Sequence, residues 1–138
     1  KRIYPHRVLS LTDKERMRLY WRSKIGFNMH VSDHRFETGN MRMYETPAHG
    51  MLMICDKAAS DAHTRIFEPG TEAVYYDSLG EAIELIEHYL AHDEDRIRIA
   101  EAGFQRYWRD YQWEPNFLSF LDWASSLQRE FQTGQEGR

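Results

Sequence analysis

Five consecutive apolar residues, Met51-Leu52-Met53-Ile54-Cys55, constrain the fold of this chain more than any other segment. A strand that is apolar at every position is typical of a sheet covered by helices on both faces. Residues 25–29 and 73–76 are also strand-like, and a fourth strand is indicated at 3–9. Helical patterns separate these strands. The sequence therefore predicts an α/β fold, a parallel sheet with flanking helices.

Local pairs of side chains mark where the helices begin. Thr12 and Glu15 form a capping box, and Ser78 and Glu81 form a second one. Asp93 is expected to cap a further helix in the same way. Each pair lies just before an apolar pattern of helical spacing, so the helix starts are predicted from local chemistry alone.

Apolar spacing predicts which helix faces are buried. The segment 40–49 is predicted as a short helix with Met41, Tyr44 and Ala48 on its buried face. The strongest helix pattern is the row of apolar residues at helical spacing between Leu79 and Leu90. A last helix is expected to have Pro115 in its first position, and the final helices are rich in aromatic residues.

Composition bounds the classes of function. The 138 residues are one domain's worth of protein, which we place at 1–131 with a flexible tail at 132–138. Cys55 is the only cysteine, so the chain has no internal disulfide and a reducing, cytoplasmic location is expected. A net charge of −4 argues against a nucleic-acid partner, and no apolar run is long enough for a membrane span. Because residue 1 is Lys and not Met, we expect a longer natural chain.

The loop between the first strand and the helix 40–49 is the expected ligand site. Ligands of open parallel sheets bind where strands end and helices begin, because helix N-termini offer unpaired N–H groups there. The backbone of Thr38-Gly39-Asn40 is small enough to approach an anion such as a diphosphate, and Arg42 adds positive charge. The alternative is an ordinary helix start with a glycine turn.

Two carboxylates flank this helix start. Glu37 lies before it and Glu45 lies in its second turn, with seven residues between them. A carboxylate near a cleft can accept two hydrogen bonds from a vicinal diol such as that of ribose. The alternative is that both are solvated charges, with Glu45 and Arg42 forming a helix-surface pair.

An ordered set of motifs carries a resemblance to a known family. The segment Glu37-Thr38-Gly39-Asn40-Met41-Arg42-Met43-Tyr44-Glu45, continued by Pro47, Gly50 and the apolar strand, resembles the E-x7-E segment of glycosyltransferase family 4 and its relatives. Phe67-Glu68-Pro69-Gly70 and His92-Asp93-Glu94-Asp95-Arg96 follow in that family's order. In particular, about residues 8–123 are similar to the "glycosyl transferases group 1" C-terminal domain of spore-maturation-type glycosyltransferases.

The resemblance implies the donor-binding half of a retaining GT-B glycosyltransferase, a Rossmann-like parallel sheet with flanking helices. Such a domain takes a nucleotide-sugar as donor without a metal or other cofactor. It implies that Glu37 is the catalytic residue facing the donor sugar and that Glu45 holds the ribose hydroxyls. The backbone amides of Gly39 and Asn40 would approach the diphosphate. We assign four more residues to the same donor site: Thr38, Arg42, His30 and, from the segment expected to seat the base, Ser10.

The chain departs from the family pattern in three ways. Thr38-Gly39-Asn40 replaces the usual Gly-Phe-Gly-type turn. The upstream Arg/Lys pair that neutralises the diphosphate has no counterpart, and neither has the N-terminal acceptor-binding domain. Because loss of a diphosphate needs charge stabilisation in the transition state, we expect no transfer by this chain alone.

Other interpretations of single features compete with this one. The spacing His30-x-x-Asp33-His34 fits a metal site, but a plain polar loop is favoured. Cys55 is interpreted as a small buried apolar residue and not as a nucleophile. The aromatic residues between 107 and 123 suit core packing or docking against a missing domain better than base stacking. For the whole chain, the alternative is a non-catalytic protein-interaction or nucleotide-sensing module.

Overall fold

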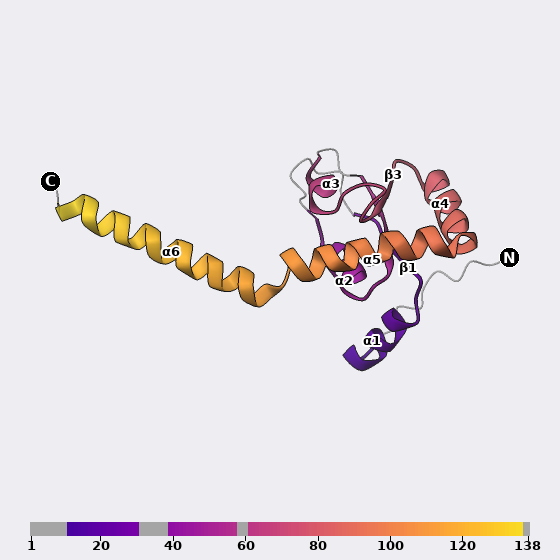
Figure 1. Ribbon diagram of the computed structural model, residues 1–138, viewed down its shortest axis with the longest axis horizontal. Helices are drawn as coiled ribbons and strands as arrows, with labels where there is room; N and C mark the ends of the chain where they lie inside the picture. Colours follow the sequence, from indigo (N-terminus) through magenta and orange to yellow (C-terminus); the bar gives the residue numbers. More distant parts are fainter. Residues whose placement is uncertain (1–10, 31–38, 58–60, 137–138) are drawn as a thin grey trace.

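The computed structural model describes residues 11–30, 39–57 and 61–136, with side chains as far as residue 129. The elements in chain order are α1 (Asp13–Trp21), β1 (Ile25–Asn28), α2 (Met41–Ala48), β2 (Leu52–Asp56), α3 (Ala62–Ile66), β3 (Val74–Tyr76), α4 (Leu79–Ala91), α5 (Asp93–Asp110) and α6 (Trp113–Glu136). Figure 1 shows their arrangement, with α5 running along the sheet and α6 projecting away from it.

The three strands form one parallel sheet in the order β1-β2-β3. Ile25 pairs with Leu52 and Asn28 pairs with Cys55, while Ile54 pairs with Val74. Parallel pairing requires a crossover between strands, which α2 and α3 supply. The predicted α/β fold class is thereby confirmed. The fourth strand expected at 3–9 lies outside the described residues.

Helices cover both faces of the sheet, as the apolar β2 predicts. One face packs Leu52, Ile54 and Val74 against α4 and the first half of α5. The other face packs Met53 and Cys55 against α2, α3 and the end of α5. Since successive strand residues point to opposite faces, a strand placed between two layers must be apolar throughout.

The caps predicted from sequence are present in part. The Thr12 box is complete, because its side chain accepts from Glu15 N–H and Glu15 accepts from Thr12 N–H. Ser78 also caps α4, but the Glu81 carboxylate accepts from Asp77 N–H. The prediction for Asp93 was wrong: it is the first residue of α5, and its carboxylate binds Lys24 and Arg96. Pro115 is the third residue of α6, which continues to Glu136 within the expected tail.

The buried face of α2 agrees with the predicted one only in part, because Tyr44 and Ala48 are half-buried and Met41 is not. Met43, Thr46 and Pro47 are buried, whereas Met41 is 75% exposed. Thr46 lies against β1, where a Cβ on Gly26 would come within 2.4 Å of the Thr46 side chain. The close approach of β1 to α2 therefore decides which face of α2 is buried. The apolar character of Met41 does not decide it.

The aromatic residues of the last two helices divide into two groups. Tyr107 and Tyr111 pack on the Met53 face of the sheet. Trp113, Phe117, Phe120 and Trp123 are exposed along α6, which extends away from the sheet in Figure 1. No helix in the described part of the chain is both long and apolar enough to cross a membrane.

Candidate functional site

A chain of polar side chains links α2 to the carboxyl edge of the sheet. The Asn40 side-chain NH2 donates to the Asn28 side-chain oxygen at 3.0 Å, and Asn28 NH2 donates to Cys55 Sγ at 3.2 Å. Asn28 is fully buried at the end of β1, and Cys55 lies beside it in β2. The N-terminus of α2 is thereby held at the carboxyl ends of the strands, the expected ligand edge of a parallel sheet.

The start of α2 has the properties of an anion site. Gly39 has a φ of 125°, and a Cβ there would lie 3.0 Å from Met43 Sδ, so the position requires glycine. Asn40 caps the helix by accepting from Arg42 N–H. The first turn holds no acidic residue, and the exposed Arg42 adds positive charge to the positive end of the helix dipole.

Glu45 lies one turn further along α2 and faces α1. Its Oε2 accepts from the Tyr20 hydroxyl at 3.1 Å, and the carboxylate is half-buried. Burial and the neighbouring Glu45 charge raise the pKa of Tyr20, which keeps that hydroxyl protonated as a donor. Glu45 is therefore a positioned carboxylate, and its partner is Tyr20 in place of the helix-surface pair with Arg42.

The structure describes only part of the predicted site. Gly39, Asn40, Arg42 and Glu45 lie together on α2 or immediately before it. Ser10, Glu37 and Thr38 lie outside the described residues, as do Asp33 and His34 of the metal-like spacing. The roles assigned to Glu37, Thr38 and Ser10 stay predictions.

His30 contacts neighbours that the sequence did not indicate. Its Nδ1 lies 2.8 Å from Asp56 Oδ1, and its backbone N–H donates to the same carboxylate. Its ring stacks on that of His63, with 4.0 Å between the ring centroids. One ring nitrogen of each histidine and Cys55 Sγ all lie within 4.8 Å of one another. His30, Cys55 and His63 are thus the described residues best placed to hold a metal ion.

Cys55 is buried, as the sequence predicted. Burial raises the pKa of its thiol to about 12, so the thiol is protonated at neutral pH and is a poor nucleophile. The hydrogen bond that the Asn28 side chain donates to Cys55 Sγ lowers the pKa of the thiol and so opposes the effect of burial. Cys55 accordingly acts as a packed residue on the Met53 face of the sheet when no metal is bound.

Asn28, Asp56 and His63 were missed by the sequence interpretation. Asn28 and Asp56 end neighbouring parallel strands, so their register places both at one edge. That pairing could have been inferred from the two strand ends, because carboxyl ends of parallel strands meet. His63 carries no comparable signal, since the five-residue α3 places it there only through tertiary packing.

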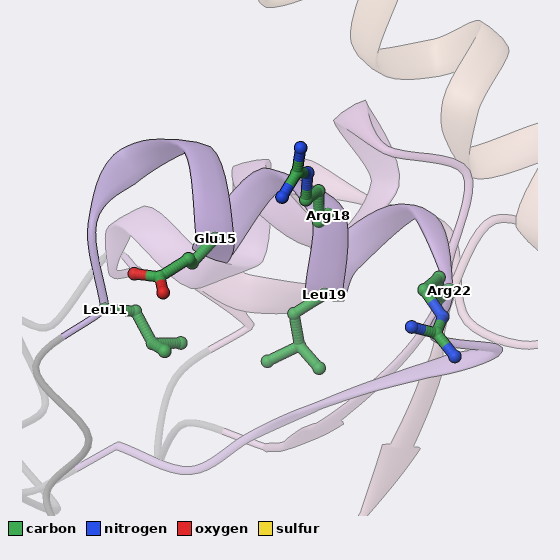
Figure 2. A pocket seen from close by; sticks show the side chains of 5 residues that line it. All are labelled: Leu11, Glu15, Arg18, Leu19 and Arg22. Atoms are coloured by element: carbon green, nitrogen blue, oxygen red, sulfur yellow. The ribbon is translucent and has the colours of Figure 1, made fainter.

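One hollow among the described residues lies away from this edge. A groove of about 580 Å³ runs along α1, lined by Leu11, Glu15, Arg18, Leu19 and Arg22. Figure 2 shows Leu11 and Leu19 on one side of α1 and Arg18 pointing away from them. A small hollow of about 140 Å³ lies between α1, β1 and α2, and its lining includes Tyr20 and Arg42. The smaller hollow adjoins the Glu45 carboxylate through Tyr20.

Comparisons with known proteins identify one family. The model of a family described as glycosyl transferase-like matches residues 5–122. The comparisons with curated proteins and with solved structures found no match. The matched range contains every described residue of the edge from Asn28 to His63.

Proposed function

The chain belongs to the glycosyl transferase-like family, and from this premise we propose that it binds the nucleotide-sugar donor of a retaining GT-B glycosyltransferase. The family match covers the expected E-x7-E segment and the strands on both sides of it. The observation that carries the proposal is the N-terminus of α2 with Arg42, held at the carboxyl edge of a parallel sheet.

The start of α2 is the proposed diphosphate site. Gly39 lets the backbone approach an anion without a side chain in the way, and the helix dipole and Arg42 favour negative charge. Such a site offers backbone N–H groups and a guanidinium to the charge of the diphosphate. We therefore propose donor binding that needs no metal at the diphosphate.

Glu45 is the proposed partner of the ribose hydroxyls. A carboxylate can accept two hydrogen bonds from a vicinal diol, and the Tyr20 hydroxyl fixes Glu45 from the side of α1. The hollow beside Tyr20 and Arg42 would take only part of the nucleoside, given its volume of about 140 Å³. Ser10 remains a proposed donor contact, whereas the His30 ring is buried against Asp56 and is not proposed to contact the donor.

The reaction we propose is transfer of the sugar to an acceptor hydroxyl with retention. The bond between the anomeric carbon and the diphosphate oxygen breaks, a bond to the acceptor oxygen forms, and the acceptor proton passes to the departing nucleoside diphosphate. Glu37 is proposed to face the sugar. An acceptor-binding domain is proposed as the partner, and the exposed aromatic residues of α6 supply a surface for it. Transfer by this chain alone is not expected.

The test is a calorimetric titration of the chain with UDP, GDP, ADP and their sugar conjugates, with and without Mg²⁺. We expect one nucleotide to bind independently of Mg²⁺. Glu45→Ala should weaken that binding more than tenfold, because two hydrogen bonds to a charged acceptor are lost. Glu87→Ala is the matched control, since Glu87 is an exposed carboxylate on α4 and distant from α2 in the sequence.

Equal affinity for Glu45→Ala and the parent chain would remove the ribose contact. Binding of free nucleotides with no gain from the attached sugar would favour a nucleotide-sensing module. If none of the nucleotides binds to the folded chain, the donor-binding proposal fails for this chain, and the exposed α6 aromatic residues favour a protein-interaction module.

A further inference from the structure

Three ligand-type side chains from different elements converge at the carboxyl edge of the sheet. His30 follows β1, Cys55 lies in β2 and His63 lies in α3. The His30 side chain is 3% exposed, and Cys55 and His63 are 0% and 1% exposed. Burying two imidazoles in a protein interior is costly unless they are satisfied by strong partners. The position of two buried imidazoles around one thiol therefore needs a chemical explanation.

The donor set is that of zinc. Imidazole nitrogen and thiolate sulfur are the ligands that Zn²⁺ prefers, in tetrahedral geometry with ligand atoms about 3.3 to 3.7 Å apart. The three atoms here lie within 4.8 Å of one another. Side-chain rotations that move each of the three ligand atoms inward by about one ångström would place them at three corners of such a tetrahedron. A water molecule would take the fourth position.

Asp56 holds both imidazoles in a metal-binding orientation. Its Oδ1 lies 2.8 Å from His30 Nδ1, and its backbone oxygen lies 3.4 Å from His63 Nδ1. A metal-bound histidine usually donates its other N–H to a carboxylate or a backbone carbonyl, which fixes the tautomer and the ring. With Nδ1 of both rings directed at Asp56, Nε2 of each ring is the metal-facing nitrogen.

The charges of the cluster also balance. A metal deprotonates a coordinating thiol, and the resulting thiolate and the Asp56 carboxylate together neutralise the two charges of Zn²⁺. Asn28 donates an N–H to Cys55 Sγ at 3.2 Å, which stabilises negative charge on the sulfur. A neutral assembly can be buried where a lone cation cannot.

We infer that His30, Cys55 and His63 bind one Zn²⁺ ion. The ion ties the ends of β1 and β2 to α3, a five-residue helix without a side-chain cap. Holding these elements together is separate from binding of the donor diphosphate at α2. The inference does not depend on the proposed transfer.

Co²⁺ is the probe for the test, because a cobalt–thiolate bond gives a charge-transfer absorption band that reports sulfur ligation. The full chain is stripped of metal, refilled with Co²⁺ and then titrated with Zn²⁺, and metal content is measured by mass spectrometry. We expect one Co²⁺ per chain, a thiolate band, displacement by Zn²⁺, and a melting temperature that rises with Zn²⁺ concentration.

Variants separate this site from surface binding. Cys55→Ser and Cys55→Ala should abolish the thiolate band and weaken Zn²⁺ binding at least a hundredfold, and His63→Gln should weaken it at least tenfold. His88→Gln is the matched control. His88 lies in α4 and His92 follows its end, and the two form an exposed stacked pair with 4.2 Å between the ring centroids, where a metal could bind adventitiously.

The wild-type spectrum decides the question even if a variant fails to fold. A folded wild-type chain that takes up Co²⁺ without a thiolate band, or takes up none, would overturn the inference. Binding that survives Cys55→Ser and disappears in His88→Gln would assign the metal to α4 instead. Failure of nucleotide binding has no bearing on these readouts, so the two proposals fail separately.

Discussion

At the scale of single residues, the Asn40 side chain makes two hydrogen bonds with different roles. Its oxygen caps α2 by accepting from Arg42 N–H, while its NH2 group donates to the buried Asn28. Ser78, the cap of α4, accepts from Glu81 N–H and sits on the surface. The two caps are therefore chemically similar, but only the Asn40 side chain also donates to a buried side chain.

We predict that Asn40→Ala destabilises the chain more than Ser78→Ala. Loss of a cap costs about 1 kcal/mol, and leaving the buried Asn28 oxygen without its donor costs about 1 to 3 kcal/mol more. Urea denaturation of both variants measures the difference in free energy of unfolding. Equal losses for the two variants would mean that the Asn40–Asn28 hydrogen bond adds nothing to stability.

At the scale of elements, α5 joins the two faces of the sheet. Its Ile99 and Ala100 pack on the Leu52 face, and Tyr107 and Tyr111 pack on the Met53 face. Between these pairs lies Gly103, where a Cβ would come within 2.4 Å of the Glu72 carbonyl oxygen. The helix can cross the connection before β3 only because this residue has no side chain.

We predict that Gly103→Ala destabilises the chain by about 1 to 3 kcal/mol, because α5 must move away from a fixed backbone oxygen. Gly80→Ala is the matched control, since Gly80 lies in α4 with its nearest contact at 3.8 Å. That substitution should be neutral or stabilise by up to about 1 kcal/mol through helix propensity. Thermal unfolding compares them, and equal midpoints would disprove the close packing of α5.

At the scale of the whole molecule, the sheet buries ionisable groups in their neutral forms. Burial raises the pKa of the Cys55 thiol to about 12 and that of the Tyr76 hydroxyl to about 12, and it raises the pKa of Tyr75 as well. The two phenols donate to backbone oxygens, Tyr76 to Asn28 and Tyr75 to His63 and Phe67. Ionisation would remove these donors from the interior.

We predict that the metal-free chain loses stability as the pH rises from about 9 to about 12. The folded pKa values lie above the ordinary thiol and phenol values of 9.0 and 10.0, so the unfolded chain releases its protons first. The stability is complete below pH 9 and falls by up to about 1.4 kcal/mol per pH unit for each group.

Tyr76→Phe tests this prediction, because it removes one ionising group and should make the alkaline loss shallower by up to about 1.4 kcal/mol per pH unit. Urea denaturation at several pH values gives the slopes. Stability that is constant from pH 9 to pH 12 would contradict the neutral burial of these groups.

Local chemistry made much of the fold predictable. Strand–helix alternation predicted the parallel sheet, and the apolar run 51–55 predicted its two covered faces. The Thr12 and Ser78 caps were predicted from spacing alone. Gly39, Asn40, Arg42 and Glu45 were placed correctly at the helix that follows β1. These features depend on residues within one helical turn or one strand of each other, which is what a sequence pattern records.

The sequence by itself determined the three strands, most of the helices and the helix start that follows β1. Tertiary structure decided which side chains meet. Packing of β1 on Thr46 buried Met43 and left Met41 exposed, and strand register joined Asn28 to Cys55. Only the placement of α3 brought His63 to His30 and Cys55. Contacts between residues far apart in the chain depend on crossover geometry and interhelical packing, and periodicity within single elements carries no information about either.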